Sequence, residues 1–88
     1  MPKKYDPLVH YLERLPKDLA ETTLSFRELE KIIGAPLPDS AFDYRPWWGN
    51  QVDHSNRPQA AAWLTAGFKV KEVNQSRKGG WVMFSRSV

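Results

Sequence analysis

The residues best suited to recognition chemistry are concentrated in the middle of the chain, between Tyr44 and Leu64. This window holds three of the four tryptophans, interleaved with Arg, Asn, His and Gln side chains. Indole rings stack on nucleic-acid bases, Arg suits guanine, and Asn or Gln suits adenine. The same residue types are also enriched in protein-binding hot spots. The pattern therefore predicts a recognition surface and not a reaction centre.

The candidate nucleic-acid-binding residues divide by role. A ring from Trp48 or Tyr44 is expected to stack on a base or wedge beside it, while Trp47 anchors the segment on the core. The alternative places both adjacent tryptophans in the core. Further polar side chains are expected to reach base edges, and the cations of a C-terminal hairpin to contact phosphates. The full candidate set is Arg45, Trp48, Asn50, Arg57, Gln59, Lys69, Lys71, Arg77 and Lys78.

Charge is distributed unevenly along the chain, whose formal net charge is +3. Residues 1–43 carry six basic and eight acidic side chains, whereas residues 44–88 carry seven basic and two acidic ones. A basic surface beside aromatic rings is typical of nucleic-acid binding. A charge pattern that serves only solubility is the alternative.

Composition argues against several functional classes. The chain has no cysteine and two isolated histidines, and we find no complete set of nucleophile, base and stabilising groups. We therefore expect neither enzymatic activity nor a metal or cofactor site. An N-terminus without a long apolar run and the lack of cysteine predict a cytoplasmic protein with no membrane partner. The length of 88 residues predicts a single domain over 1–88.

Local signals predict three helical segments in the first half of the chain. Asp6-Pro7 is expected to start a helix, with Asp6 as its cap, and Pro16 to stop it. Ser25 and Glu28 have the spacing of a capping box, and Gly34 supplies a left-handed stop. A short helix is expected to start at Pro38 or Ser40 and to run through Tyr44.

The second half predicts one helix followed by two strands. Asn56 is expected to cap a helix that runs to Ala66, and residues 68–73 and 81–86 alternate as half-buried strands. Residues 74–80 form the connecting loop, with two cations next to two glycines. The predicted class is α+β, with three to four short helices followed by a C-terminal β-hairpin. The order resembles a winged helix-turn-helix. A different α+β arrangement is the alternative, because about twenty residues separate the two helices of the motif.

The chain also resembles a family of small, functionally uncharacterised bacterial domains. The resemblance covers nearly the whole chain and rests on the Tyr5-Asp6-Pro7-Leu8 start, the Trp47-Trp48-x-Asn50 element and Ala66-Gly67-Phe68. It implies a DNA-related role, because such domains sometimes accompany nuclease-type domains. It implies no catalytic residues.

Two functions from different classes follow. The first is a small nucleic-acid-binding protein, with double-stranded DNA as its ligand. The second is a protein–protein interaction module that docks a partner on the tryptophan-rich surface. A homodimer is compatible with either function. The two differ in their response to salt, because counterion release makes nucleic-acid affinity fall steeply as salt rises.

Overall fold

The computed structural model describes residues 4–50 and 58–87. The described part of the chain is an α+β structure, which confirms the expected class. Its helices and strands follow one another as α1 (Asp6–Glu13), β1 (Glu21–Ser25), α2 (Phe26–Ile33), α3 (Ser40–Asp43), the 3-10 helix η1 (Arg45–Trp48), α4 (Pro58–Thr65), β2 (Phe68–Asn74) and β3 (Trp81–Arg86).

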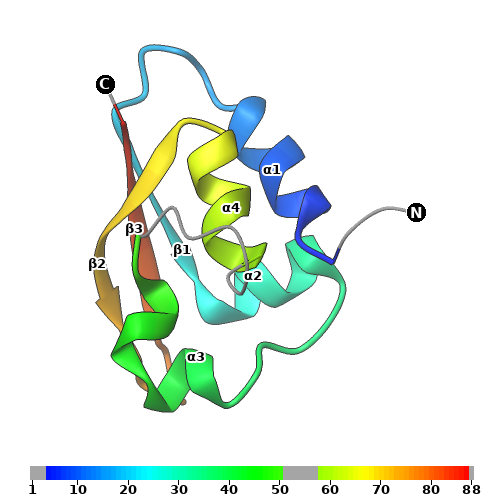
Figure 1. The fold of residues 1–88 in the computed structure, drawn as a ribbon, viewed down its shortest axis with the longest axis vertical. Coiled ribbons are helices and arrows are strands. Elements are labelled where there is room, and N and C mark those ends of the chain that lie inside the picture. The colour runs from blue at the N-terminus through cyan, green and yellow to red at the C-terminus, as the bar shows by residue number, and fades with distance from the viewer. Residues whose placement is uncertain (1–3, 51–57, 88) are drawn as a thin grey trace.

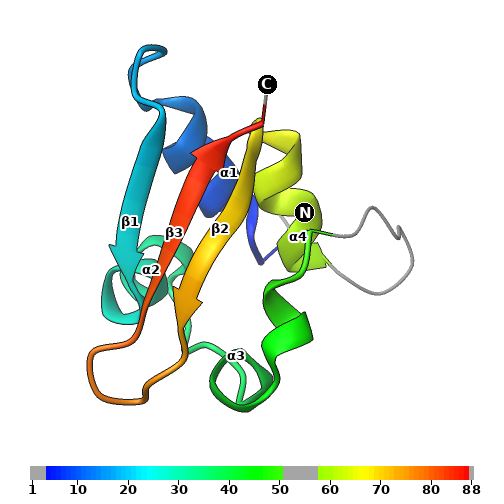
Figure 2. The same cartoon turned by 90° about the vertical axis from the view of Figure 1, so that its left-hand side faces the viewer.

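The strands form one antiparallel sheet in the order β1-β3-β2. The sheet stands on one side of the molecule, with α2 and α4 against a single face of it and α1 packed on α2 and α4 on the same side (Figure 1). Turned by 90°, the molecule presents the opposite face of the sheet to the viewer, with no described helix in front of it (Figure 2). The sheet therefore has one covered and one open face.

The hairpin expected at the C-terminus does not stand alone. Strand β1 comes from the first half of the chain and pairs with β3, so that Thr23 lies opposite Met83 and Leu24 opposite Val82. The last strand in the sequence is thus the central strand of the sheet. The residues of β1 indicate a strand only weakly, because Leu24 is the single large apolar residue among them.

The capping box at the start of α2 is confirmed. The Ser25 hydroxyl accepts from the Glu28 amide at 3.0 Å, and the Glu28 carboxylate accepts from the Ser25 amide at the same distance. These hydrogen bonds lower the pKa of Glu28, the backbone amide contributing most. Gly34 ends the helix with φ of 73°, a conformation that glycine adopts without strain.

Other helix boundaries differ from the expectation. The cap position of α1 is Tyr5, and Asp6 is the first helical residue and not the cap. The described part of α4 begins at Pro58, and the predicted Asn56 cap lies outside the described residues. The short helix expected to run through Tyr44 is α3, which ends one residue earlier.

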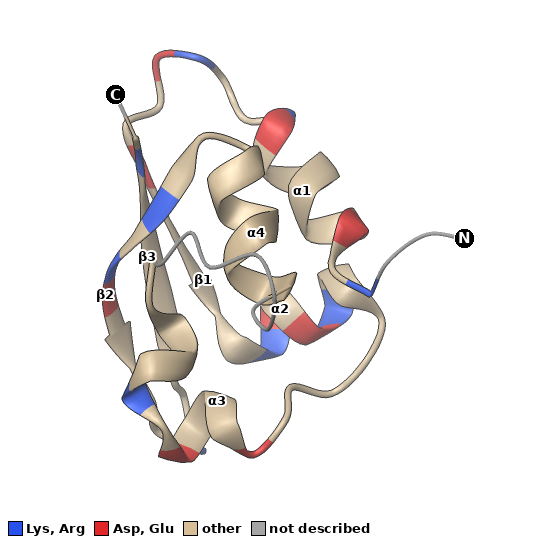
Figure 3. Ribbon diagram, viewed as in Figure 1, with Lys and Arg blue, Asp and Glu red and all other residues tan. Residues whose placement is uncertain are grey.

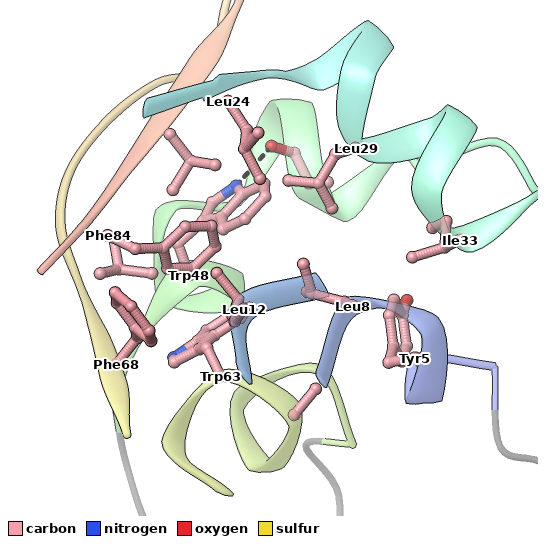
Figure 4. Close-up of a cluster of buried hydrophobic side chains, with 14 of the residues drawn as sticks. Tyr5, Leu8, Leu12, Leu24, Leu29, Ile33, Trp48, Trp63, Phe68 and Phe84 are labelled. Carbon is pink, nitrogen blue, oxygen red and sulfur yellow. Dashed lines mark hydrogen bonds between the residues drawn. The ribbon is translucent and has the colours of Figure 1, made fainter. Parts of the chain in front are cut away.

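Large aromatic side chains fill the core between the sheet and the helices (Figure 4). Trp48, Trp63, Phe68 and Phe84 are all at most 1% exposed. The rings of Trp48 and Trp63 stack at 5.7 Å, and Trp63 packs against Phe84 at 5.6 Å. Side chains of α1 such as Leu12 complete the cluster. A small domain has little apolar area to bury, and tryptophans supply much of it here.

Candidate nucleic-acid interface

Both adjacent tryptophans pack in or against the core, as in the alternative stated above, and Trp48 is the more deeply buried of the two. Trp48 is 1% exposed and stacks on Phe26 at 5.2 Å. Its indole N–H donates to the Ala41 carbonyl at 2.8 Å, the dashed line at Trp48 in Figure 4. The prediction that Trp48 is a stacking surface is therefore wrong. Trp47 is only partly buried and contacts the Trp48 ring edge-on at 4.6 Å. Which of two neighbouring rings is buried depends on the rest of the fold, and in η1 the more deeply buried ring is that of Trp48.

Asn50 has a structural role instead of reaching a base. Its side-chain amide donates to the Val70 carbonyl at 2.9 Å, and its oxygen accepts from the Val70 amide at 2.8 Å. The same oxygen accepts from the indole N–H of Trp63 at 3.1 Å. Asn50 thus pairs with β2 as a neighbouring strand would, and it satisfies a buried donor of the core. Both the side-chain nitrogen and the side-chain oxygen of Asn50 therefore form hydrogen bonds within the domain.

The remaining predicted base-reading residues lie in different environments. Gln59 is 6% exposed and donates to the Trp47 carbonyl at 3.2 Å, so the prediction that it reaches a base edge is wrong. Arg57 lies outside the described residues. Arg45 is exposed at the start of η1, next to Tyr44, which is 53% exposed. Of this set, Arg45 and Tyr44 keep a free surface.

The cations of the strands are only partly available. Lys69 is exposed and has no ion pair with any described carboxylate. Lys71 sits at a bulge in β2 and pairs with Glu21, which raises its pKa. Arg86 is only partly exposed; its guanidinium donates to the Leu19 carbonyl at 2.7 Å and stacks over the Phe68 ring at 4.7 Å. Arg86 therefore holds the turn before β1 in place and does not project toward a ligand.

Arg77 fastens the loop between β2 and β3 to α3. Its guanidinium lies 2.9 Å from the Asp43 carboxylate, 3.7 Å from that of Asp39 and 4.7 Å above the Phe42 ring. The side chain of Gln75 adds a hydrogen bond to the Ala41 carbonyl at 3.0 Å. An exposed ion pair contributes little stability by itself, but these contacts together set the position of the loop.

The loop, α2 and α3 line a solvent-open cavity of about 460 Å³ at the end of the sheet where β1 leads into α2. Three cations line it, Arg27 from α2 and Arg77 and Lys78 from the loop. Its one carboxylate is that of Glu30, which already accepts from the Leu37 amide at 2.8 Å. Arg27 and Lys78 are exposed and have no ion pair with a described carboxylate. The cavity is therefore suited to an anion.

A tight backbone approach brings the two sides of this cavity together. The Phe26 amide donates to the Gly80 carbonyl at 2.9 Å, which extends the β1–β3 pairing by one step. A Cβ atom at Gly80 would lie 2.7 Å from the Phe26 ring and 2.3 Å from the Ser76 carbonyl oxygen. Only glycine fits at this position. Because glycine has no side chain, the start of α2 and the loop approach closely enough to line the same cavity.

Sequence reasoning missed Arg27. No local signal distinguishes Arg27 from the other charged residues of α2. Its proximity to Lys78 follows from the pairing of β1 with β3, which joins segments more than fifty residues apart.

The residues of α4, in contrast, include no charged side chain (Figure 3).

Among residues 4–50 and 58–87, no group of three His, Cys, Asp or Glu side chains could hold a metal ion. No described helix combines the length and the apolar character that crossing a membrane requires.

Comparison with known proteins places the chain in a family. It belongs to DUF7662, a domain family of unknown function whose model matches residues 5–87. This confirms the expected membership of a family of uncharacterised small domains. No curated protein matches the chain, and no solved structure does.

Proposed function

We propose that this member of a family of unknown function binds nucleic acid, with the phosphate backbone held at the cavity between α2 and the loop that joins β2 to β3. The observation that carries the proposal is the pair Arg27 and Lys78, two exposed cations that line one cavity without a described acidic partner. Phosphate oxygens are the anions that Arg and Lys hold most often at nucleic-acid interfaces.

The order of elements supports a winged helix-turn-helix arrangement. In this proposal α2 and α4 are the two helices of the motif, and the loop between β2 and β3 is the wing. The position of β1 between the first two helices and its pairing with β3 are compatible with this arrangement. Double-stranded DNA is then the expected ligand, with α4 directed toward the major groove.

The distribution of charge determines how such a complex would form. Exposed residues in the described part of α4 are Pro58, Ala61 and Thr65, none of which carries a charge. Phosphate contacts therefore fall to the loop and to α2. Binding of this kind depends on the backbone, has low sequence specificity and weakens as salt rises.

The proposal is one of binding without catalysis, and fluorescence anisotropy tests it. Labelled duplex DNA is titrated with the wild-type protein and with the double variant Arg27→Ala/Lys78→Ala at low and moderate salt. The matched control is Arg14→Ala/Lys17→Ala, which removes the same charge from exposed positions at the end of α1 and the turn after it. Arg77 is not substituted, because its loss would also release the loop.

The expected result is salt-sensitive binding that weakens at least tenfold in the cavity variant and much less in the control. If each cation holds one phosphate, its loss removes a charge-assisted contact of about 1.5 kcal/mol or more. Equal weakening in both variants would show that only net charge matters. Absence of binding at low salt would refute the function.

A second function, docking of a protein partner, was expected on the tryptophan-rich surface. Trp48 and Trp63 are each 1% exposed, so the described part of that surface offers the partly exposed Trp47 beside Tyr44 and Arg45. We therefore propose nucleic-acid binding ahead of protein docking.

A further inference from the structure

The open face of the sheet carries two large apolar side chains. Val82 and Phe84 of β3 are fully buried against the helices. Because alternate residues of a strand point to opposite faces, Trp81 and Met83 lie on the open face, where no described helix covers them (Figure 2). Both are partly exposed, and neither belongs to the hydrophobic core.

Trp81 therefore differs from the three other tryptophans. Trp47, Trp48 and Trp63 contact one another's rings and build the core. Trp81 lies between Ser25 of β1 and Asn74 of β2, two polar residues, in the register of the sheet. A hydrophobic cross-strand pair, which is the usual structural reason for an aromatic residue on a sheet, does not account for it.

Trp81 also lies next to the basic cavity. Gly80, which lines the cavity, precedes it in the chain, and Ser25, which also lines the cavity, is its partner across the sheet. Consecutive Cα atoms are about 3.8 Å apart, so the backbone of Trp81 adjoins the cavity rim. A phosphate and the base attached to it could occupy the two places at once.

The charges near this ring favour a nucleotide strand over an acidic or neutral peptide. No carboxylate occupies the row formed by Ser25, Trp81 and Asn74. At the end of the sheet beyond this row, Arg27 and Lys78 supply positive charge. In the next row along the face, the exposed Glu72 lies opposite Met83, and Glu21 is paired with Lys71. The row that holds the Trp81 ring thus lies between these carboxylates and the cationic end of the sheet.

We propose that Trp81 stacks on an unpaired base of a nucleic-acid strand whose phosphate is held by Arg27 and Lys78. The inference rests on the proposed function and specifies its ligand as nucleic acid with unpaired nucleotides, such as a duplex with a single-stranded overhang. Paired bases inside a duplex are stacked on their neighbours and are not available to this ring. Stacking is tolerant of sequence, because every base has a π face.

The test compares three DNA probes of equal phosphate number, a blunt duplex, a duplex with an overhang and a single strand. Each is titrated with the wild type and with Trp81→Ala, Trp81→Phe and Met83→Ala. We expect the two probes with unpaired bases to bind about fivefold to 150-fold more tightly than the blunt duplex, the range of one base–aromatic stack. Trp81→Ala should abolish this preference and leave blunt-duplex affinity unchanged.

Two controls separate stacking from a loss of folding. Trp81→Phe keeps a ring and should retain much of the preference, and Met83→Ala, on the same face without a ring, should retain nearly all of it. Tryptophan fluorescence adds a direct readout, because stacking on a base quenches the indole. Quenching is expected in the wild type and should disappear in Trp81→Phe although that variant still binds.

The outcomes distinguish this inference from the proposed function. Equal binding of all three probes without quenching would refute the stacking site and leave phosphate binding intact. No salt-sensitive binding of any probe would refute both. A concentration-dependent dimer that Trp81→Ala dissociates would show that a second copy covers the face, and it would overturn the inference.

Discussion

Replacement of Asn50 by alanine tests the structural role of the Trp-Trp-x-Asn segment. The substitution removes the acceptor of two donors, the Val70 amide and the Trp63 indole N–H, and the donor to the Val70 carbonyl. Val70 and Trp63 are only 6% and 1% exposed. An unsatisfied buried polar group costs about 1–3 kcal/mol. Because Asn50 itself lies at an exposed position, water can replace part of what is lost, so we expect a loss of about 2–4 kcal/mol.

This loss is large for a domain of this size. Stabilities of roughly 0.05–0.15 kcal/mol per residue give about 4–13 kcal/mol for such a chain. With a urea m value of about 1–1.5 kcal/mol/M, the unfolding midpoint should fall by roughly 2 M. Urea titration followed by far-ultraviolet circular dichroism measures this change without relying on tryptophan signals.

Two variants make the measurement specific. Asn50→Asp keeps an acceptor for both donors but cannot donate to Val70 when ionised, so its stability should fall between those of the wild type and Asn50→Ala. Asn74→Ala is the matched control, because Asn74 is exposed and its side chain accepts a single hydrogen bond from the described residues, that of the Ser76 amide at 3.0 Å. If Asn50→Ala is within about 0.5 kcal/mol of the wild type, or no worse than the control, the assigned role is wrong.

Four further substitutions probe other parts of the fold. Ser25→Ala should cost about 1 kcal/mol through loss of the helix cap. The pKa of Glu28 is lowered in the folded state. Its contribution to folding stability is therefore present above the ordinary glutamate pKa of about 4.3 and is lost as pH falls through the folded-state pKa. Glu28→Gln should flatten the acid limb of the stability–pH curve, and an unchanged limb would contradict this. Arg86→Ala should cost about 1.5–3 kcal/mol in urea titration and leave DNA affinity unchanged, and weaker binding by a folded variant would contradict the structural role. Gly80→Ala should cost about 1–3 kcal/mol through its clash with Phe26, and a neutral result would show that the loop can shift.

Local sequence signals predicted local structure well. The capping box at Ser25 and the left-handed stop at Gly34 depend on residues within one helix, and both are present. Burial and partnership depend on distant residues and were predicted less well. Trp48 is in the core because Phe26, Ala41 and Trp63 surround it, and no pattern within the Trp-Trp segment indicates which ring turns inward.

The candidate site shows the same division. The cations of the loop, Arg77 and Lys78, were predicted from their place between two strands, and both line the cavity. Arg27 could not be predicted, because it reaches the cavity through the pairing of β1 with β3. Conversely, Gln59 was assigned to a ligand although it is bound to the Trp47 carbonyl within the domain. A polar side chain in a helix gives no sequence signal of whether its partner is internal or external.

The most direct test of the central claim is the salt dependence of DNA affinity for the wild type and Arg27→Ala/Lys78→Ala. Each phosphate contact contributes about 0.7–0.9 to the slope of log affinity against log salt. If both cations hold phosphates, the slope for the double variant should be smaller than that of the wild type by roughly 1.4–1.8, and Arg14→Ala/Lys17→Ala should leave it nearly unchanged. An unaltered slope in the cavity variant would contradict the claim that this cavity is where the protein binds nucleic acid.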